Sequence, residues 1–174
     1  MPAQLIFLIQ LIFGYVVCLL WFRTYILPKL KSMDRFNAQR VIATIHSFRF
    51  FGLVFILPGV VGHNLPAGFA TFAAYGDFTT GVLAILALLS ARIRPLFGFF
   101  VAAFNLVGTF DLIVDYYHAM RLGLPEIAGE LGAAYVIPII YVPMLMITNV
   151  VALYWLARPH TNAATAIAGR TAFS

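Results

Sequence analysis

The chain has 174 residues, of which 63% are hydrophobic and 10% charged, with a formal net charge of +5 and a mean hydropathy of +0.96. Soluble domains carry roughly 25% charged residues, so this composition excludes an ordinary water-soluble globule. Five spans of about 20 residues would use most of the length and leave only short loops and a tail. We therefore expect an all-α integral membrane protein, a bundle of five transmembrane helices.

Five apolar stretches predict the spans in chain order. The first lacks the basic start and small-residue cleavage site of a signal peptide, so we expect an uncleaved span. The other four are each bounded by Pro, Gly or charged residues. The expected transmembrane domain covers 1–158, with spans at about 4–22, 41–61, 68–90, 96–117 and 134–157, and a flexible cytoplasmic tail follows at 159–174.

Basic residues gather in the loops after the first, third and fifth spans, whereas the opposite side carries Arg121 with Glu126 and Glu130. The positive-inside rule then predicts an N-terminus outside and a C-terminus in the cytoplasm of a bacterial inner membrane. We expect the lipid bilayer as partner, with a homo-oligomer or a larger membrane complex as further candidates, and no nucleic acid. The clustered basic residues are Arg23, Lys29, Lys31, Arg35, Arg40, Arg92, Arg94, Arg158 and Arg170.

Two charged residues inside the spans lie at the same expected depth. Arg49 is near the middle of the second span, and Asp77 is about nine residues into the third, which runs the other way. An unpaired charge in the bilayer costs about 2.5 to 3.5 kcal/mol on insertion scales. The sequence therefore predicts an intramembrane ion pair between Arg49 and Asp77, and leaves open whether it fixes helix packing or faces a substrate or a proton.

The fourth span ends with Asp111, Asp115 and His118, which are spaced i, i+4 and i+7 and so share one helix face. Two carboxyl groups with an imidazole are candidate catalytic groups, and they are also candidate ligands for a divalent metal. The same residues at a helix end could equally be solvated or structural. His63, Glu126 and Glu130 belong to the same outer layer and could complete a site.

Haem is a second candidate cofactor, through an axial His46 on the second span. His46 and His118 are expected near opposite ends of their helices, so one haem could not bridge them. The simpler alternative is a hydrogen bond between His46 and Asn149 of the fifth span. That span contains Pro138 and Pro143, which predict a kinked helix with inward-facing polar residues.

Three functions fit these patterns. The first is a small non-catalytic membrane subunit or binding protein with a buried polar cluster. The second is a membrane-embedded enzyme acting on a lipidic substrate through Asp111, Asp115 and His118. The third is a proton- or cation-coupled transporter component. Nucleotide-binding loops, zinc-protease motifs and a thiol pair for redox chemistry are absent, since Cys18 is the single cysteine.

Overall fold

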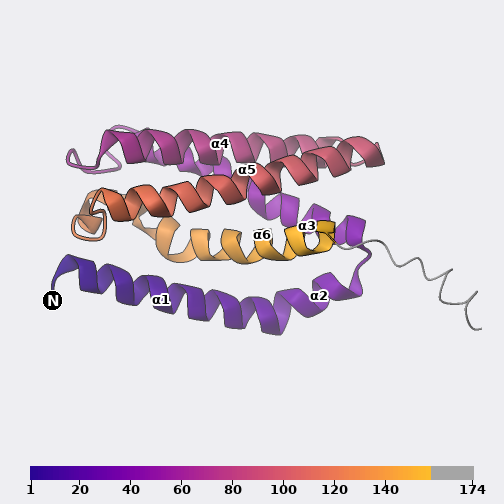
Figure 1. Ribbon diagram of the computed structural model, residues 1–174, viewed down its shortest axis with the longest axis horizontal. Helices are drawn as coiled ribbons and strands as arrows, with labels where there is room; N and C mark the ends of the chain where they lie inside the picture. Colours follow the sequence, from indigo (N-terminus) through magenta and orange to yellow (C-terminus); the bar gives the residue numbers. More distant parts are fainter. Residues whose placement is uncertain (158–174) are drawn as a thin grey trace, which may run out of the picture.

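A computed structural model describes residues 1–157, and it is helical without strands over that range (Figure 1). Four helices in it are long and apolar enough to cross a membrane: Ala3–Ser32, Ala67–Leu89, Arg94–Arg121 and Ile137–Ala157. The predicted all-helical chain is confirmed over these residues, together with apolar helices long enough to cross a membrane. The expected cytoplasmic tail at 159–174 lies outside the described residues.

The first helix is longer than the predicted span 4–22. Helix α1 (Ala3–Trp21) continues through a π-helical turn (Phe22–Ile26) into α2 (Leu27–Ser32). The turn lies directly before Pro28, whose ring has no N–H to continue the α-helical bonding. The helix therefore bends at the proline and continues past the apolar stretch into the basic segment.

The segment expected to form the second span is not one regular helix. Helix α3 (Arg35–Ser47) changes at Phe48 into a 3₁₀-helix, η2 (Phe48–Ile56). The backbone of η2 packs directly against α4, because a Cβ placed on Gly81 would come within 2.9 Å of the Phe50 nitrogen. This backbone contact accompanies the tighter winding, which apolar patterning alone does not predict.

Helices α4 (Ala67–Leu89) and α5 (Arg94–Arg121) form an antiparallel hairpin in the upper part of Figure 1. The first matches the expected span 68–90 closely, and α5 extends beyond 96–117 at both ends. The last helix starts with a 3₁₀ segment (Ala128–Tyr135) and a π-helical turn (Ile137–Tyr141), and α6 (Val142–Ala157) completes it. The π-helical turn contains Pro138 and ends just before Pro143, at the place where a kink was predicted.

The bundle has two ends, which differ in character. At the loop end, segments 57–66 and 122–134 are joined because Gly62 N–H donates to the Glu130 carbonyl at 2.7 Å and Asn64 N–H donates to its carboxylate at 3.1 Å. At the basic end lie α2, the start of α3 and the turn from α4 to α5 (Figure 1). Each end has its own apolar core.

Helix α1 lies at the edge of the bundle (Figure 1). Only 17% of its most apolar stretch is buried, compared with 39% in α4 and α5. It is fastened chiefly to the last helix, where Gly14 lies so close to the Ile139 carbonyl that a side chain could not fit between them. Helix α1 is thus the least covered of the long helices.

Candidate functional site

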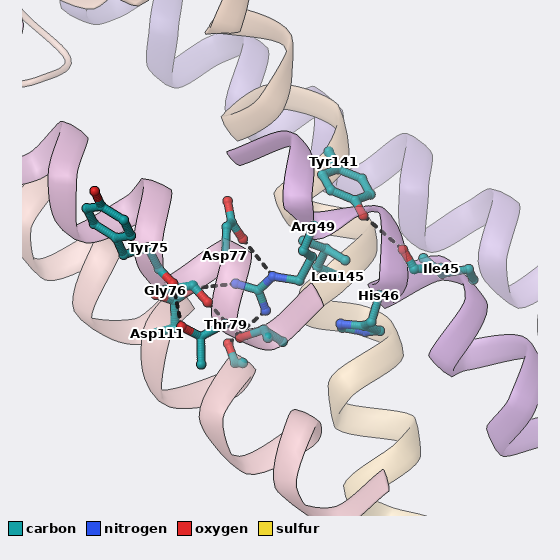
Figure 2. A network of polar contacts seen from close by, with 12 residues as sticks. Ile45, His46, Arg49, Tyr75, Gly76, Asp77, Thr79, Asp111, Tyr141 and Leu145 are labelled. Atoms are coloured by element: carbon teal, nitrogen blue, oxygen red, sulfur yellow. Dashed lines mark hydrogen bonds and ion pairs between the residues drawn. The ribbon is translucent and has the colours of Figure 1, made fainter. Parts of the chain in front are cut away.

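Arg49 lies at the centre of a buried polar cluster (Figure 2). Its side chain is 0% exposed. The guanidinium donates from Nε to Asp77 Oδ1 at 2.6 Å, from Nη1 to the Gly108 carbonyl at 3.2 Å, and from Nη2 to Asp111 Oδ2. One cation is therefore shared by carboxylates from α4 and α5, and it draws η2, α4 and α5 together.

Glycines make the room for this cluster. A Cβ on Gly76 would collide with the Asp111 carboxylate, and one on Gly52 would collide with the Asp77 side chain. A Cβ on Gly108 would come within 2.5 Å of Arg49 Nη1. Three helical elements can bring charged groups into contact here because each presents a glycine at the crossing.

The three residues of the predicted ladder on α5 have separate surroundings. Asp111 is held by Arg49, whereas Asp115 lines an apolar pocket and its buried Oδ1 has no hydrogen-bond partner. His118 packs against Phe72 with ring centroids 5.0 Å apart. Within residues 1–157, no group of three or more His, Cys, Asp or Glu side chains is placed to hold a metal ion. Helical spacing places all three residues on one face of α5. Because Asp111 contacts Arg49 and His118 contacts Phe72, they do not form one site with Asp115.

The pocket that Asp115 lines is here called the carboxyl pocket. It lies at the loop end, between α1, η2, α4, α5 and the start of the last helix. Its volume is about 60 Å³, which is room for a few water molecules. Asp77 and Asp115 are its two acidic groups, and the other lining residues are Phe7, Leu11, Phe55, Phe69, Ala73, Leu112, Tyr116, Ala119, Met120, Leu124, Pro125, Ile137, Pro138 and Val142.

A pair of tyrosines links α1 to α5 beside this pocket. The Tyr15 and Tyr116 hydroxyl groups are 2.7 Å apart, within hydrogen-bonding distance, and Tyr116 also lines the pocket. A side chain on the least covered helix is thus tied to the pocket wall. Sequence reasoning missed this pair, because only the packing of α1 brings residues so far apart along the chain together.

His46 is fully buried near the Arg49 cluster, at the other side from the carboxyl pocket. Its Nε2 lies 3.0 Å from the Thr148 hydroxyl, and its ring packs on Phe104 with centroids 5.2 Å apart. The expected partner Asn149 was wrong by one residue, since Thr148 is the residue that faces His46. Nδ1 of His46 and both polar side-chain atoms of Asn149 are buried without partners.

The remaining outer-layer candidates are spread over the loop end. His63 and Glu126 are exposed. Glu130 accepts hydrogen bonds from the backbone and side-chain amide groups of Asn64, at 3.1 and 3.2 Å. Glu130 therefore joins the two loops instead of completing a site with the α5 residues.

A family model matches residues 6–157, which is most of the chain and nearly all of the described bundle. That family is described as Domain of unknown function (DUF8737). The chain belongs to this family. Neither the curated proteins nor the solved structures include a match. The match covers the Arg49 cluster and the carboxyl pocket, so both lie within the family domain.

Proposed function

We propose that this DUF8737 protein is a small multi-pass membrane protein that binds an amphiphilic ligand in the carboxyl pocket. The observation that carries the proposal is the buried Asp115 oxygen without a partner, in a pocket otherwise lined almost wholly by apolar side chains. Membrane-embedded carboxyl groups are costly unless paired, so a group left open to a pocket favours a ligand that pairs with it.

The chemistry of the lining defines the ligand class. The aliphatic and aromatic walls suit a hydrocarbon chain, and the Asp115 carboxyl suits a head group that donates hydrogen bonds, such as an amine. Asp77 faces the same pocket but is already held by Arg49. Asp115 is therefore the residue that we assign to the head group.

Entry of such a ligand requires the pocket to widen, because its volume of about 60 Å³ holds only a few water molecules. Helix α1 is the wall that can move at least cost, since it has the least buried surface of the long helices. We propose that parting of the Tyr15–Tyr116 pair lets α1 move away from α5 and admits the ligand from the bilayer.

Photo-crosslinking tests this function. A long-chain amine bearing a diazirine, added to the protein in mild detergent, should label α5 and α1 residues that line the pocket. A fatty acid with the same chain and diazirine should label them far less. Asp115→Asn should lower amine labelling about tenfold, because it removes a charge-assisted contact.

The control is Glu126→Gln, which removes an exposed carboxylate at the same end of the bundle. It should leave the labelling unchanged. Labelling confined to the lipid-facing side of α1, or equal labelling by amine and fatty acid, would contradict the proposal.

The topology we propose has five passes, with α3 and η2 together making the second crossing. The N-terminus lies outside and the C-terminus in the cytoplasm of a bacterial inner membrane. Support comes from the charges: Arg23, Lys29, Lys31, Arg35, Arg40, Arg92 and Arg94 all lie towards the basic end, and Arg121 is the basic residue at the loop end. A homo-oligomer or larger complex is a further proposal.

A proton- or cation-coupled transporter component is a second candidate. It is favoured by buried polar atoms without hydrogen-bond partners between the carboxyl pocket and the basic end: Asp111 Oδ1, His46 Nδ1, Asn105 Oδ1, the Asn149 amide and Gln39 Oε1. Such atoms can hold a chain of water molecules. Proton flux into liposomes that Asp77→Asn abolishes would favour this candidate over the binding protein. The enzyme alternative has less support, because Asp111 is paired with Arg49 and His118 packs on Phe72, so neither is combined with Asp115 in one site.

A further inference from the structure

A second pocket lies at the basic end, between α3, the start of α5 and the end of α6. It is far from the Arg49 cluster along these helices and shares no lining residue with the carboxyl pocket. Its volume is about 600 Å³. We call it the basic pocket. It is lined by Arg35, Phe36, Gln39, Arg94, Phe97, Gly98, Val101, Trp155, Leu156 and Ala157.

The guanidinium groups of two arginines border this pocket, and both arginines contact residues with aromatic side chains. Arg94 lies over the Phe36 ring at 5.4 Å from its centroid, and Phe36 packs against Phe97 at 4.6 Å. Arg35 donates from Nη1 to the Trp155 carbonyl at 3.4 Å. Guanidinium groups of this kind, held beside apolar surface, are well suited to bind a phosphate in a bidentate manner.

The local charge balance also favours an anion. In segments 27–40 and 90–94, which form this end of the bundle, Asp34 is the one acidic residue and the other charged side chains are basic. The Asp34 carboxylate is engaged at the start of α3, where it accepts from the Asn37 N–H at 3.0 Å. The 28-residue helix α5 begins at Arg94, so its positive N-terminal end also faces this region.

Gln39 gives a second and independent indication of a ligand. Its side chain is 6% exposed, and Nε2 donates to the Ala152 carbonyl at 3.2 Å. Its Oε1 is buried without a partner, although the residue lines the pocket. A buried amide oxygen without a donor is costly, so the expected ligand brings a hydroxyl or an ammonium group as well as an anion.

We propose that the basic pocket binds the head group of an anionic phospholipid that carries hydroxyl donors, as phosphatidylglycerol does. The phosphodiester contacts Arg94 and Arg35, and a glycerol hydroxyl donates to Gln39 Oε1. The acyl chains run along the exposed apolar surface of the bundle at Gly98 and Leu156. Basic pockets between transmembrane helices on the cytoplasmic side bind lipid head groups in this way.

Native mass spectrometry of the full chain in mild detergent tests this site. Titration with phosphatidylglycerol should give adducts at concentrations at least tenfold lower than titration with phosphatidylcholine of the same chains. Arg94→Gln should weaken phosphatidylglycerol binding about tenfold, because one charge-assisted contact is lost. Arg94 is exposed, so this variant is expected to fold.

Arg92→Gln is the matched control, with the same charge change at the same end but outside the pocket. It should alter the affinity less than twofold. Equal losses from Arg92→Gln and Arg94→Gln would overturn the site in favour of general surface charge, and so would equal affinity for the two lipids.

Two further probes test the parts of the ligand separately: phosphatidic acid tests the glycerol head group, and inorganic phosphate tests the lipid chains. The wild-type chain should bind phosphatidylglycerol more tightly than phosphatidic acid, which has no glycerol head group, and Gln39→Leu should abolish that difference. Equal affinity of the wild type for both lipids would overturn the role of Gln39. Displacement of phosphatidylglycerol by millimolar inorganic phosphate would overturn the lipid as the ligand. Failure of the amine labelling described above would leave this site unaffected.

Discussion

At the scale of single residues, Arg49 is the group on which the buried charges depend. It is the cation that Asp77 and Asp111 share, so Arg49→Met would leave both carboxyl groups without their ion-pair partner inside the bundle. Removing one partner of a buried ion pair costs about 3 to 5 kcal/mol. We expect a loss of this size in thermal or denaturant unfolding of the protein in detergent.

Adding Asp77→Asn and Asp111→Asn to Arg49→Met should recover part of that loss, because no uncompensated charge is left. Arg121→Met is the control, because Arg121 is exposed and, among the interactions described, contacts only the face of the Tyr117 ring. This variant should change the free energy of unfolding by no more than about 0.5 kcal/mol. Additive losses in the combined variant would show that the three side chains do not act together.

Gly76 allows a sharper test of the same cluster, because α4 offers a matched control. A Cβ on Gly76 would strike the Asp111 carboxylate, whereas one on Gly68 of the same helix meets nothing within 4 Å. Gly76→Ala should therefore destabilise the protein by about 1 to 3 kcal/mol. Gly68→Ala should stabilise it by about 0.5 to 1 kcal/mol through helix propensity. Unfolding midpoints in detergent measure both, and a stabilised Gly76→Ala would contradict the geometry.

At the scale of the element, the start of α3 depends on Asp34. Its carboxylate accepts from the Asn37 N–H at 3.0 Å, which lowers the pKa of Asp34 below its usual value. Because the pKa of Asp34 is lower in the folded state than in the unfolded chain, this cap contributes its full stabilisation at pH values above the unfolded pKa, about 4. The stabilisation is lost as the pH falls below about 4 and through the folded pKa.

The Asn37 amide resonance should accordingly titrate below about pH 4 in the wild type and stay constant in Asp34→Asn, which caps without a charge. In Asp34→Ala the amide should be exposed to hydrogen exchange at every pH. An Asn37 amide that titrates in the same way in Asp34→Asn would show that another group controls it.

The elements differ in how far the sequence could predict them. The ends of helix α4 lie close to those of the expected span, because Pro and charge flank that stretch, whereas α5 extends beyond its expected span at both ends. The continuation of α1 past Arg23 was missed, since a charge ends an apolar stretch without ending a helix. The 3₁₀ segment after Phe48 was missed because it accompanies the backbone contact at Gly81, which is a tertiary feature.

The sequence could predict a contact of the site only where two charged residues share the same expected depth in the membrane. Counting residues along the spans matched Arg49 with Asp77, and the structure joins these two and adds Asp111. Helical spacing grouped Asp111 with Asp115 and His118, but it could not indicate that Arg49 would hold the first of them. The glycine at 108, one turn before Asp111, was the available signal for a close approach.

At the scale of the whole molecule, the side of the membrane on which each end lies depends on the segment 35–56. If α3 and η2 cross together, the residues that flank them lie on opposite sides. If they do not, the chain crosses four times and both termini lie on the same side. The broken geometry of this segment makes it the decisive one, since the four other proposed crossings are each a helix long and apolar enough to span a membrane.

Single cysteines placed on either side of this segment decide between five and four crossings. In a Cys18→Ala background, His63→Cys should react with a membrane-impermeant maleimide in intact cells, because His63 is exposed at the loop end. Met33→Cys, which is 42% exposed at the basic end, should react only after the membrane is opened. This direction follows from the proposed orientation, in which the positive-inside rule places the basic residues next to Met33 in the cytoplasm. Equal reactivity of the two cysteines in intact cells would mean that 35–56 does not cross, and the five-pass topology would then be wrong.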